Sequence, residues 1–206
     1  MPSKNEILSG LETIANRMEA IASIWHILAF MAFLAVAAGW RPVRKSIALM
    51  LVPIVLSVAV LAWIHRNPVN GASFTLLSIA LAILGLRMAA VPTLRPQRWA
   101  MWLGIAMIGF GCVYPHFLSA RSGFWYLYSA PMGLLPCPTL SFVIGITLVA
   151  GGLGSRAWCL ILAVAGLGYG LFGTLRLGVW LDVGLVLGAT GLLAVGLRRG
   201  SQRPEP

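Results

Sequence analysis

The chain has few charged residues and hardly any acidic ones. Only 10% of its 206 residues are charged, compared with about 25% in soluble domains. Acidic residues number 5, whereas 59% of the chain is apolar and the mean hydropathy is +0.90. This composition excludes an ordinary soluble enzyme and a disordered chain. It indicates a protein that crosses a membrane several times.

Common catalytic and metal-binding motifs are also missing. The sequence contains no phosphate-binding glycine loop with a lysine, no HExxH, no GxSxG and no CxxC. Hydrolysis by an acid pair needs two carboxylates, and Asp182 is the only acid inside an apolar segment. Three cysteines are too few for a disulfide framework. The sequence therefore favours a protein that is not an enzyme, although redox chemistry stays open.

The net charge of +10 arises from 15 basic and 5 acidic residues. On a soluble protein this excess would indicate a nucleic-acid partner. Here the basic residues flank hydrophobic runs, and no basic stripe is interleaved with aromatic residues. Membrane topology therefore explains the charge, and we expect the lipid bilayer, not nucleic acid, as the partner.

Apolar segments of near membrane-spanning length divide most of the chain. They comprise residues 20–40, 46–64, 72–91, 99–118, 139–154, 157–175 and 179–197. The segment 139–154 is short and follows three prolines, so a re-entrant segment is the alternative there. The predicted fold is an all-α integral membrane bundle of about seven transmembrane helices, residues 20–197, followed by a basic tail, residues 198–206.

Residues 1–19 are predicted to form an amphipathic helix. Apolar side chains recur at spacings of four and three residues, which is typical of one helical face. These residues are Ile7, Leu11, Ile14, Met18 and Ile21. Ser3 and Glu6 have the spacing of a capping box at its start. We expect this helix to lie on the membrane or to extend the first span.

Basic residues are unevenly shared between the two ends of the predicted spans. One end has five: Lys4, Arg17, Arg66, Arg121 and Arg176. The other end has ten: Arg41, Arg44, Lys45, Arg87, Arg95, Arg98, Arg156, Arg198, Arg199 and Arg203. Because cytoplasmic loops are enriched in basic residues, we predict an N-terminus outside and a C-terminus in the cytoplasm.

This topology places most chemically reactive side chains near the outer face. They are His26, His65, Cys112, His116, Cys137, Arg176 and Asp182. A thiolate and an imidazole are suitable ligands for copper or zinc, so Cys112, His116 and Cys137 are the candidate metal ligands. Cys112 and His116 share a helix face if Pro115 leaves the turn intact. The alternatives are packed cysteines or a Cys112–Cys137 disulfide.

Asp182 has two possible roles. An acid within a membrane segment is a candidate for proton or cation transfer. Alternatively it forms a structural pair with Arg176, near the start of the last span. His26 and Trp125 are further candidates for an ion or substrate pathway. Trp125 lies in the aromatic loop 119–136, which is either an interfacial belt or a lid over an outward pocket.

Glycine pairs predict close packing of the last three helices. Gly166 and Gly170 are four residues apart, as are Gly184 and Gly188. Small residues at this spacing let helix backbones approach closely in a membrane.

A family resemblance is found around the proline-rich loop. The stretches that carry it are Tyr114-Pro115, Ala130-Pro131-Met132-Gly133, Pro136-Cys137-Pro138-Thr139 and Gly145, with Ser23-Ile24-Trp25 upstream. They resemble a family of bacterial polytopic membrane proteins classed as a domain of unknown function, in which Pro-Cys-Pro-Thr opens a helix. His26 stands where that family has proline. The resemblance implies a helical membrane fold in the bacterial inner membrane and implies no ligand or activity.

Three hypotheses for function follow. The first is an inner-membrane protein that handles or transports a small solute or soft metal ion through an outward-facing site. The second is a non-catalytic subunit or assembly factor that docks partner helices or forms a homo-oligomer. The third is a thiol redox enzyme that uses Cys112 and Cys137.

Overall fold

The computed structural model describes residues 3–118 and 123–200, and within them the chain is helical with no strand. The helices are α1 Lys4–Arg17, α2 Glu19–Ala37, α3 Arg44–Ile64, α4 Pro68–Arg87, α5 Arg98–Val113, α6 Tyr126–Ser129, α7 Pro136–Val149, α8 Arg156–Leu171 and α9 Asp182–Gly200. Two 3-10 turns, Gly123–Trp125 and Gly151–Gly154, and a π-helical turn, Phe172–Arg176, join some of them.

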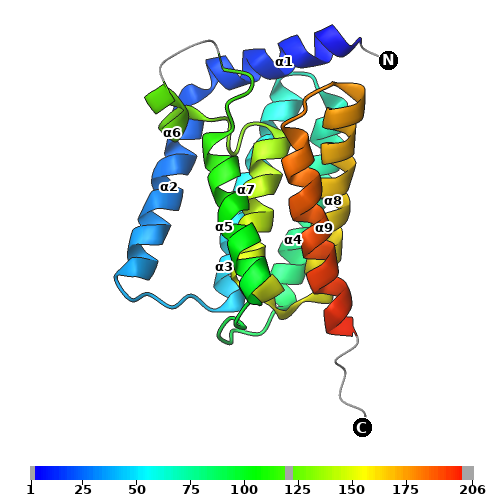
Figure 1. Ribbon diagram of the computed structural model, residues 1–206. Helices are drawn as coiled ribbons and strands as arrows, with labels where there is room; N and C mark the ends of the chain where they lie inside the picture. The colour runs from blue at the N-terminus through cyan, green and yellow to red at the C-terminus, as the bar shows by residue number, and fades with distance from the viewer. Residues whose placement is uncertain (1–2, 119–122, 201–206) are drawn as a thin grey trace.

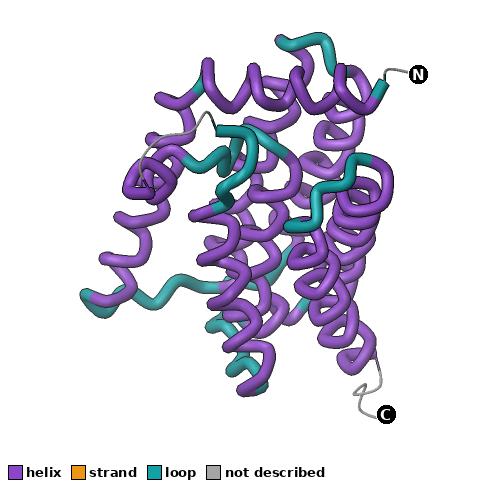
Figure 2. The backbone as a smooth tube through the Cα atoms, turned by 45° about the horizontal axis from the view of Figure 1, so that its top comes forward, coloured by secondary structure: helices purple, strands orange, loops and turns teal. Residues whose placement is uncertain are grey.

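The long helices run side by side, and α1 lies across one end of them (Figure 1). We call the end covered by α1 the N-terminal end and the opposite end the basic end. Figure 2, tilted to bring the N-terminal end forward, shows the loops that gather beneath α1. The predicted all-α bundle is confirmed, since each predicted apolar segment coincides with one helix.

Helix boundaries differ from the predicted ones where prolines and caps decide them. Pro68 occupies the first turn of α4, where its missing N–H costs nothing, and Asn67 caps the N–H of Asn70 at 3.2 Å. Pro115 ends α5 at Val113, five residues before the predicted limit of 118. Pro136 begins α7 three residues before the predicted start at 139.

The predicted N-terminal cap is confirmed. The Ser3 hydroxyl accepts from the N–H of Glu6, and the Glu6 carboxylate accepts from the N–H of Ser3 at 2.6 Å. These hydrogen bonds from Ser3 hold the pKa of Glu6 below its usual value. The apolar face of α1 buries Leu11 and Ile14 against the bundle. Helix α1 therefore covers the N-terminal end of the bundle, and Met18 separates it from α2.

Helix α7 is the buried centre of the bundle. Its side chains from Thr139 to Gly145 are all buried, and the helix packs against α3, α5, α8 and α9. A helix that is apolar on every face is stable only inside a bundle or a membrane. Helix α7 runs along the bundle to the turn that begins α8 (Figure 1), and it does not double back as a re-entrant segment would.

Glycines allow close approach in two of the helix pairs. Gly166 and Gly170 of α8 face α9, where an added Cβ would lie 2.9 Å from Ala189 and 2.8 Å from Val186. Gly104 of α5 faces the backbone of α7, and an added Cβ at Gly104 would lie 2.8 Å from the Gly145 carbonyl oxygen. The predicted close packing is confirmed for α8 and α9. The equally close α5–α7 pair was not predicted.

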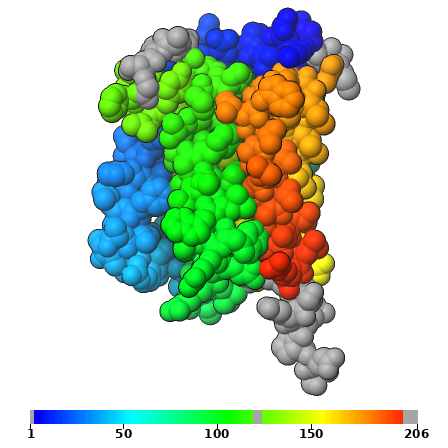
Figure 3. Space-filling view, in the orientation of Figure 1, coloured from blue at the N-terminus to red at the C-terminus, as the bar shows by residue number. Residues whose placement is uncertain are grey.

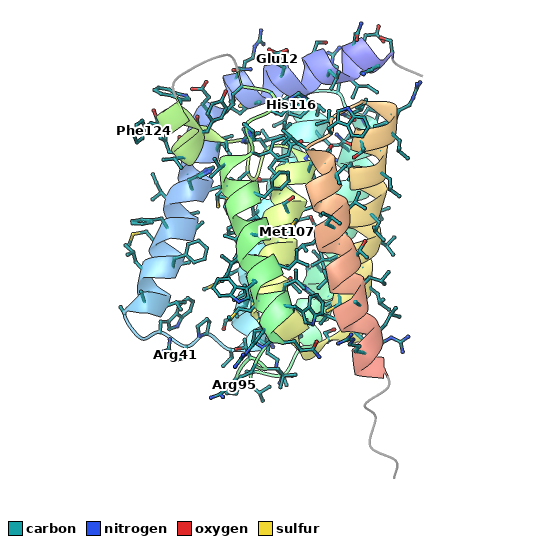
Figure 4. All side chains as sticks on the ribbon, viewed as in Figure 1. Glu12, Arg41, Arg95, Met107, His116 and Phe124 are labelled. Carbon is teal, nitrogen blue, oxygen red and sulfur yellow. The ribbon has the colours of Figure 1, made fainter. Side chains whose placement is uncertain are left out.

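Four helices, α2, α3, α4 and the α8 segment Arg156–Arg176, are long and apolar enough to cross a membrane. Helices α5 and α7 are shorter apolar helices. Charged side chains among the described residues gather at the two ends, as the labelled Glu12 and His116 and the labelled Arg41 and Arg95 illustrate (Figure 4). Arg121, Arg203 and residues 119–122 and 201–206 of the predicted loop and tail lie outside the described residues.

Candidate functional site

Asp182 is the buried carboxylate of the bundle. It is the first residue of α9, and only 2% of it is exposed. The other acids that the structure describes, Glu6, Glu12 and Glu19, lie in α1 or at the start of α2. A carboxylate removed from water must be paired or hydrogen-bonded. The partners of Asp182 therefore define what the site can do.

Two neighbouring helices each supply one partner for Asp182. The hydroxyl of Tyr114, at the end of α5, donates to Oδ1 at 2.7 Å. The thiol of Cys137, in the first turn of α7, donates to Oδ2 at 3.3 Å. The site thus joins the ends of three helices, two of which carry the proline that fixes the local geometry. Pro115 ends α5 directly after Tyr114, and Pro136 opens α7 directly before Cys137.

The space for the carboxylate comes from a glycine in the π-helical turn Phe172–Arg176 that follows α8. A Cβ on Gly173 would overlap Oδ2 of Asp182 and lie 2.7 Å from its Cγ. A π-helical turn inserts one extra residue into a helix and often occurs at functional sites. Here it widens the backbone beside α9, and the carboxylate fills that space.

The predicted pairing of Asp182 with Arg176 is not found. Across residues 3–118 and 123–200 the carboxylate contacts Tyr114 and Cys137 and has no ion pair. Arg176 closes the π-helical turn, six residues before Asp182. Proximity in sequence therefore did not bring the two charges together, because the chain turns between them at Gly178, whose φ is +68°.

His26 forms a second polar contact at the same end of the bundle. Its Nδ1 lies 2.8 Å from the carbonyl oxygen of Ala22, and its Nε2 lies 3.0 Å from the carbonyl oxygen of Cys112. Each carbonyl can only accept, so both contacts are hydrogen bonds only when both ring nitrogens carry protons. His26 is buried and links α2 to the end of α5. It is a structural cross-link that does not contact Asp182.

The predicted metal ligands do not assemble. Helix α5 ends before Pro115, so Cys112 and His116 do not share a helix face. The thiol of Cys112 points to the sulfur of Met132 at 3.9 Å, and the ring of His116 packs edge-on against Phe117 with centroids 4.2 Å apart. No group of three or more histidine, cysteine or acidic residues is formed by the part of the chain that the structure describes.

None of the three cysteines forms a disulfide. The Cys112–Cys137 disulfide, weighed above as an alternative, is therefore not formed. Cys112 packs against the core, whereas the Cys137 thiol donates a hydrogen bond to Asp182. Of the predicted metal set, Cys137 is hydrogen-bonded to Asp182, and His116 interacts with the same carboxylate electrostatically.

The aromatic loop has exposed aromatic side chains in its first part and a buried segment in its second part. Phe124 is 79% exposed and Tyr128 is 42% exposed, as expected of an interfacial belt. Trp125 packs against Tyr128 with ring centroids 5.0 Å apart, and its carbonyl accepts from Ser129. Trp125 therefore packs within the aromatic loop, and its predicted place on a pathway stays a prediction.

The remainder of this loop, residues 130–135, is buried and was not predicted to be so. The carbonyl of Gly133 accepts from Ser57 of α3, and its N–H donates to Thr139 Oγ1 at 2.8 Å. The indole of Trp25 covers Gly133, whose φ is +77°. Irregular backbone at membrane depth is stable where protein buries it. This segment holds Cys137 in place from the side of α2 and α3.

An apolar pocket of about 490 Å³ opens beside the carboxylate site. Its lining comes from α5, α6, the segment after α5 and the turn before α9: Phe110, Val113, Pro115, Tyr126 and Leu181. Val113 and Pro115 flank Tyr114 in sequence, and Leu181 precedes Asp182. Tyr114 and Asp182 are themselves buried and do not line the pocket, so it adjoins the carboxylate site through the residues next to them in sequence.

Comparison with family models, with curated proteins and with solved structures finds no match to this chain. The resemblance to a bacterial membrane family stays a prediction, and function is argued from the residues themselves.

Proposed function

We propose that the protein is an integral membrane protein of the bacterial inner membrane, with α2, α3, α4, α5, α7, α8 and α9 as its seven spans. The sides of the bundle support this proposal. Large apolar side chains are exposed along α2 to α5, for example Phe30 at 60% and Trp102 at 65%. Soluble monomers rarely expose contiguous apolar surface on this scale. The uneven basic residues favour an N-terminus outside and a C-terminus in the cytoplasm.

Cysteine labelling tests this topology. Glu12→Cys at the N-terminal end is expected to react with a membrane-impermeant thiol reagent on spheroplasts, and Arg41→Cys only after permeabilisation. Both positions are exposed and lie at opposite ends of α2. The parent protein, with its three native cysteines, sets the background. Reaction of both variants from outside would contradict a crossing by α2, and the reversed pattern would contradict the orientation.

We further propose that the protein handles a small solute or cation in exchange for a proton at Asp182. One observation carries this proposal: the buried carboxylate is held by two groups that can each donate or accept a hydrogen bond. An arginine partner would fix the ionised state, since a guanidinium only donates. A hydroxyl and a thiol can satisfy the carboxyl group in either protonation state.

The exchange follows from the hydrogen bonds. In the ionised state Tyr114 and Cys137 both donate to Asp182. When Asp182 takes up a proton at Oδ1, its new O–H donates to the Tyr114 oxygen, and the Tyr114 hydroxyl turns its own proton away. The heavy atoms need not move, because the hydroxyl rotates about its C–O bond. A cation would bind the carboxylate in place of the proton. The Tyr114 hydroxyl and the Cys137 thiol would then keep their hydrogen atoms but turn them away from Asp182.

Infrared spectroscopy tests the exchange. Titrating the lipid-reconstituted protein with acid is expected to produce the C=O stretching band of protonated carboxyl groups. The contribution of Asp182 should be missing from this band in Asp182→Asn, whereas Glu6 and Glu12 still contribute. Tyr114→Phe should shift the band, because one hydrogen bond to Oδ1 is lost. Glu12→Gln, which removes an exposed acid on α1, is the matched control. A band of unchanged size in Asp182→Asn would refute a proton role for this residue.

A docking subunit is the second candidate, and the position of α2 favours it. Only 6% of the apolar stretch of α2 is buried inside the structure, compared with 44% of that of α3. In Figure 3 α2 lies at the outer side of the bundle beside α5, and its Phe33 ring lies 6.4 Å from that of Phe142 in α7. A partner helix or a second copy of the chain would bury this face. A thiol redox enzyme has no such support, because Cys112 and Cys137 have different partners.

A further inference from the structure

A second pocket lies at the basic end, far along the bundle from Asp182. Its volume is about 270 Å³. The segment that leads into α5 forms one wall, with Arg95 and Gln97, and α9 forms the other, with Val195 and Arg198. Leu148, near the end of the central helix α7, closes the floor. The pocket therefore brings two guanidinium groups above an apolar base.

Neither arginine of this pocket has an acidic partner among residues 3–118 and 123–200. Arg198 donates to Gln97 Oε1 at 2.9 Å, and its guanidinium carbon lies 6.0 Å from the centroid of the Trp99 ring. The acids that the structure describes are in α1, at the start of α2 and at the start of α9, all towards the N-terminal end. The positive charge at the pocket is therefore not neutralised by the described residues.

Gln97 organises the pocket. Its side-chain oxygen accepts from Arg198 and also from the indole N–H of Trp99 at 2.6 Å. These two hydrogen bonds hold the Arg198 side chain beside the start of α5, where the first backbone N–H groups of the helix are free of intrahelical partners. Gln97 is the N-cap of α5 and forms no side-chain cap there. Guanidinium groups and helix N–H groups together favour an oxyanion.

We propose that this pocket binds the phosphate group of an anionic phospholipid. The inference goes beyond the proposed exchange at Asp182, and it rests on the proposed membrane location. Two arginines match a phosphodiester, since guanidinium groups bind phosphate oxygens in pairs. Leu148, Val195 and Leu94 provide apolar contact for the glycerol and first methylene groups. Basic pockets between helices on the cytoplasmic side are suited to such headgroups.

Native mass spectrometry tests the proposal. The full chain is reconstituted into vesicles of equal phosphatidylglycerol and phosphatidylcholine and extracted gently, and the bound lipids are counted. We expect the wild type to retain phosphatidylglycerol in preference to phosphatidylcholine. The double variant Arg95→Gln/Arg198→Gln should bind phosphatidylglycerol roughly ten- to a hundredfold more weakly, as expected for the loss of hydrogen bonds to a charged group.

The control carries the same loss of charge at the same end. Arg41→Gln/Arg156→Gln removes two exposed arginines that do not line the pocket. Retention of phosphatidylglycerol at the wild-type level by this control supports a specific site. An equal loss in both double variants would overturn it in favour of general surface attraction. Equal thermal unfolding midpoints establish that all variants are folded.

Inorganic phosphate distinguishes the two sources of the oxyanion. If the detergent-solubilised protein, stripped of lipid, binds phosphate as tightly as it binds phosphatidylglycerol, the lipid assignment is overturned in favour of a free phosphate site. Binding of phosphatidylglycerol alone supports the lipid. Flotation of the vesicles is measured first, because failure to insert would refute the membrane location and this inference together. Insertion without any retained lipid would refute this inference only.

Discussion

Replacing Gly145 by leucine is expected to destabilise the bundle by about 3 kcal/mol or more, the upper part of the range measured for overpacked cores. A Cβ at Gly145 would lie 2.7 Å from the carbonyl oxygen of Gly104 and 2.7 Å from the N–H nitrogen of Ile108. Both neighbours are backbone atoms of α5, which cannot rotate away as a side chain can. The helices must separate, and the thermal unfolding midpoint in detergent should fall sharply.

Gly109→Leu is the matched control for this prediction. Gly109 is an exposed residue of α5, and a Cβ there would have nothing within 4 Å. The change adds the same side chain to the same helix pair without entering the contact. Its unfolding midpoint should stay close to that of the wild type. Equal losses in Gly145→Leu and Gly109→Leu would mean that the α5–α7 contact does not limit stability.

The contrast between glycine pairs indicates what the sequence can predict about packing. Gly166 and Gly170 form a visible four-residue spacing, and they do face α9. Although Gly104 and Gly111, seven residues apart, both face α7, Gly104 and Gly145 belong to no glycine pair at four-residue spacing. Their contact depends on which helices are neighbours and at what rotation. That information lies in long-range packing and not in local spacing.

Helix identity was predictable for physical reasons. Long apolar runs need internal hydrogen bonds, so they form helices, and Ser3 with Glu6 marks the start of α1 by a local hydrogen-bond pattern. Proline effects were only partly predicted. Pro68 and Pro136 start helices earlier than the hydropathy suggests, because a proline is favourable in the first turn.

The carboxylate site was half predicted. Asp182 and Cys137 are conspicuous in sequence, one as the acid of the apolar segments and one as a thiol between two prolines. Tyr114 was missed because a tyrosine at a helix end is typical of a membrane interface. The signal that could have identified it is its position between Cys112 and Pro115, where the helix must stop. Its full burial depends on α9, a segment 68 residues later.

The buried segment 130–135 supplies the second large effect. Gly133→Ala is expected to cost about 2–4 kcal/mol, the sum of a strained backbone and an overpacked contact. The φ of Gly133 is +77°, which an alanine adopts only with strain. Its added Cβ would also lie 2.6 Å from Nε1 of Trp25. Because Gly133 bonds to Ser57 and Thr139, the loss should spread to α3 and α7 and loosen the support of Cys137.

Gly39→Ala separates the two contributions. Gly39 has a φ of +104°, and a Cβ there would have nothing within 4 Å, so this variant reports backbone strain alone. We expect it to lose about 1 kcal/mol. Trp25→Leu combined with Gly133→Ala completes the comparison, because a smaller side chain in α2 should restore part of the stability in a double-mutant cycle. Equal unfolding midpoints for Gly133→Ala and Gly39→Ala would show that the Trp25 side chain can move aside without a cost in stability. In that case the Trp25 contact would contribute little to the attachment of α2, which Ala22, His26 and Phe33 also hold against the bundle. Helix α2, with only 6% of its apolar stretch buried, would then be free to shift when Asp182 exchanges its proton.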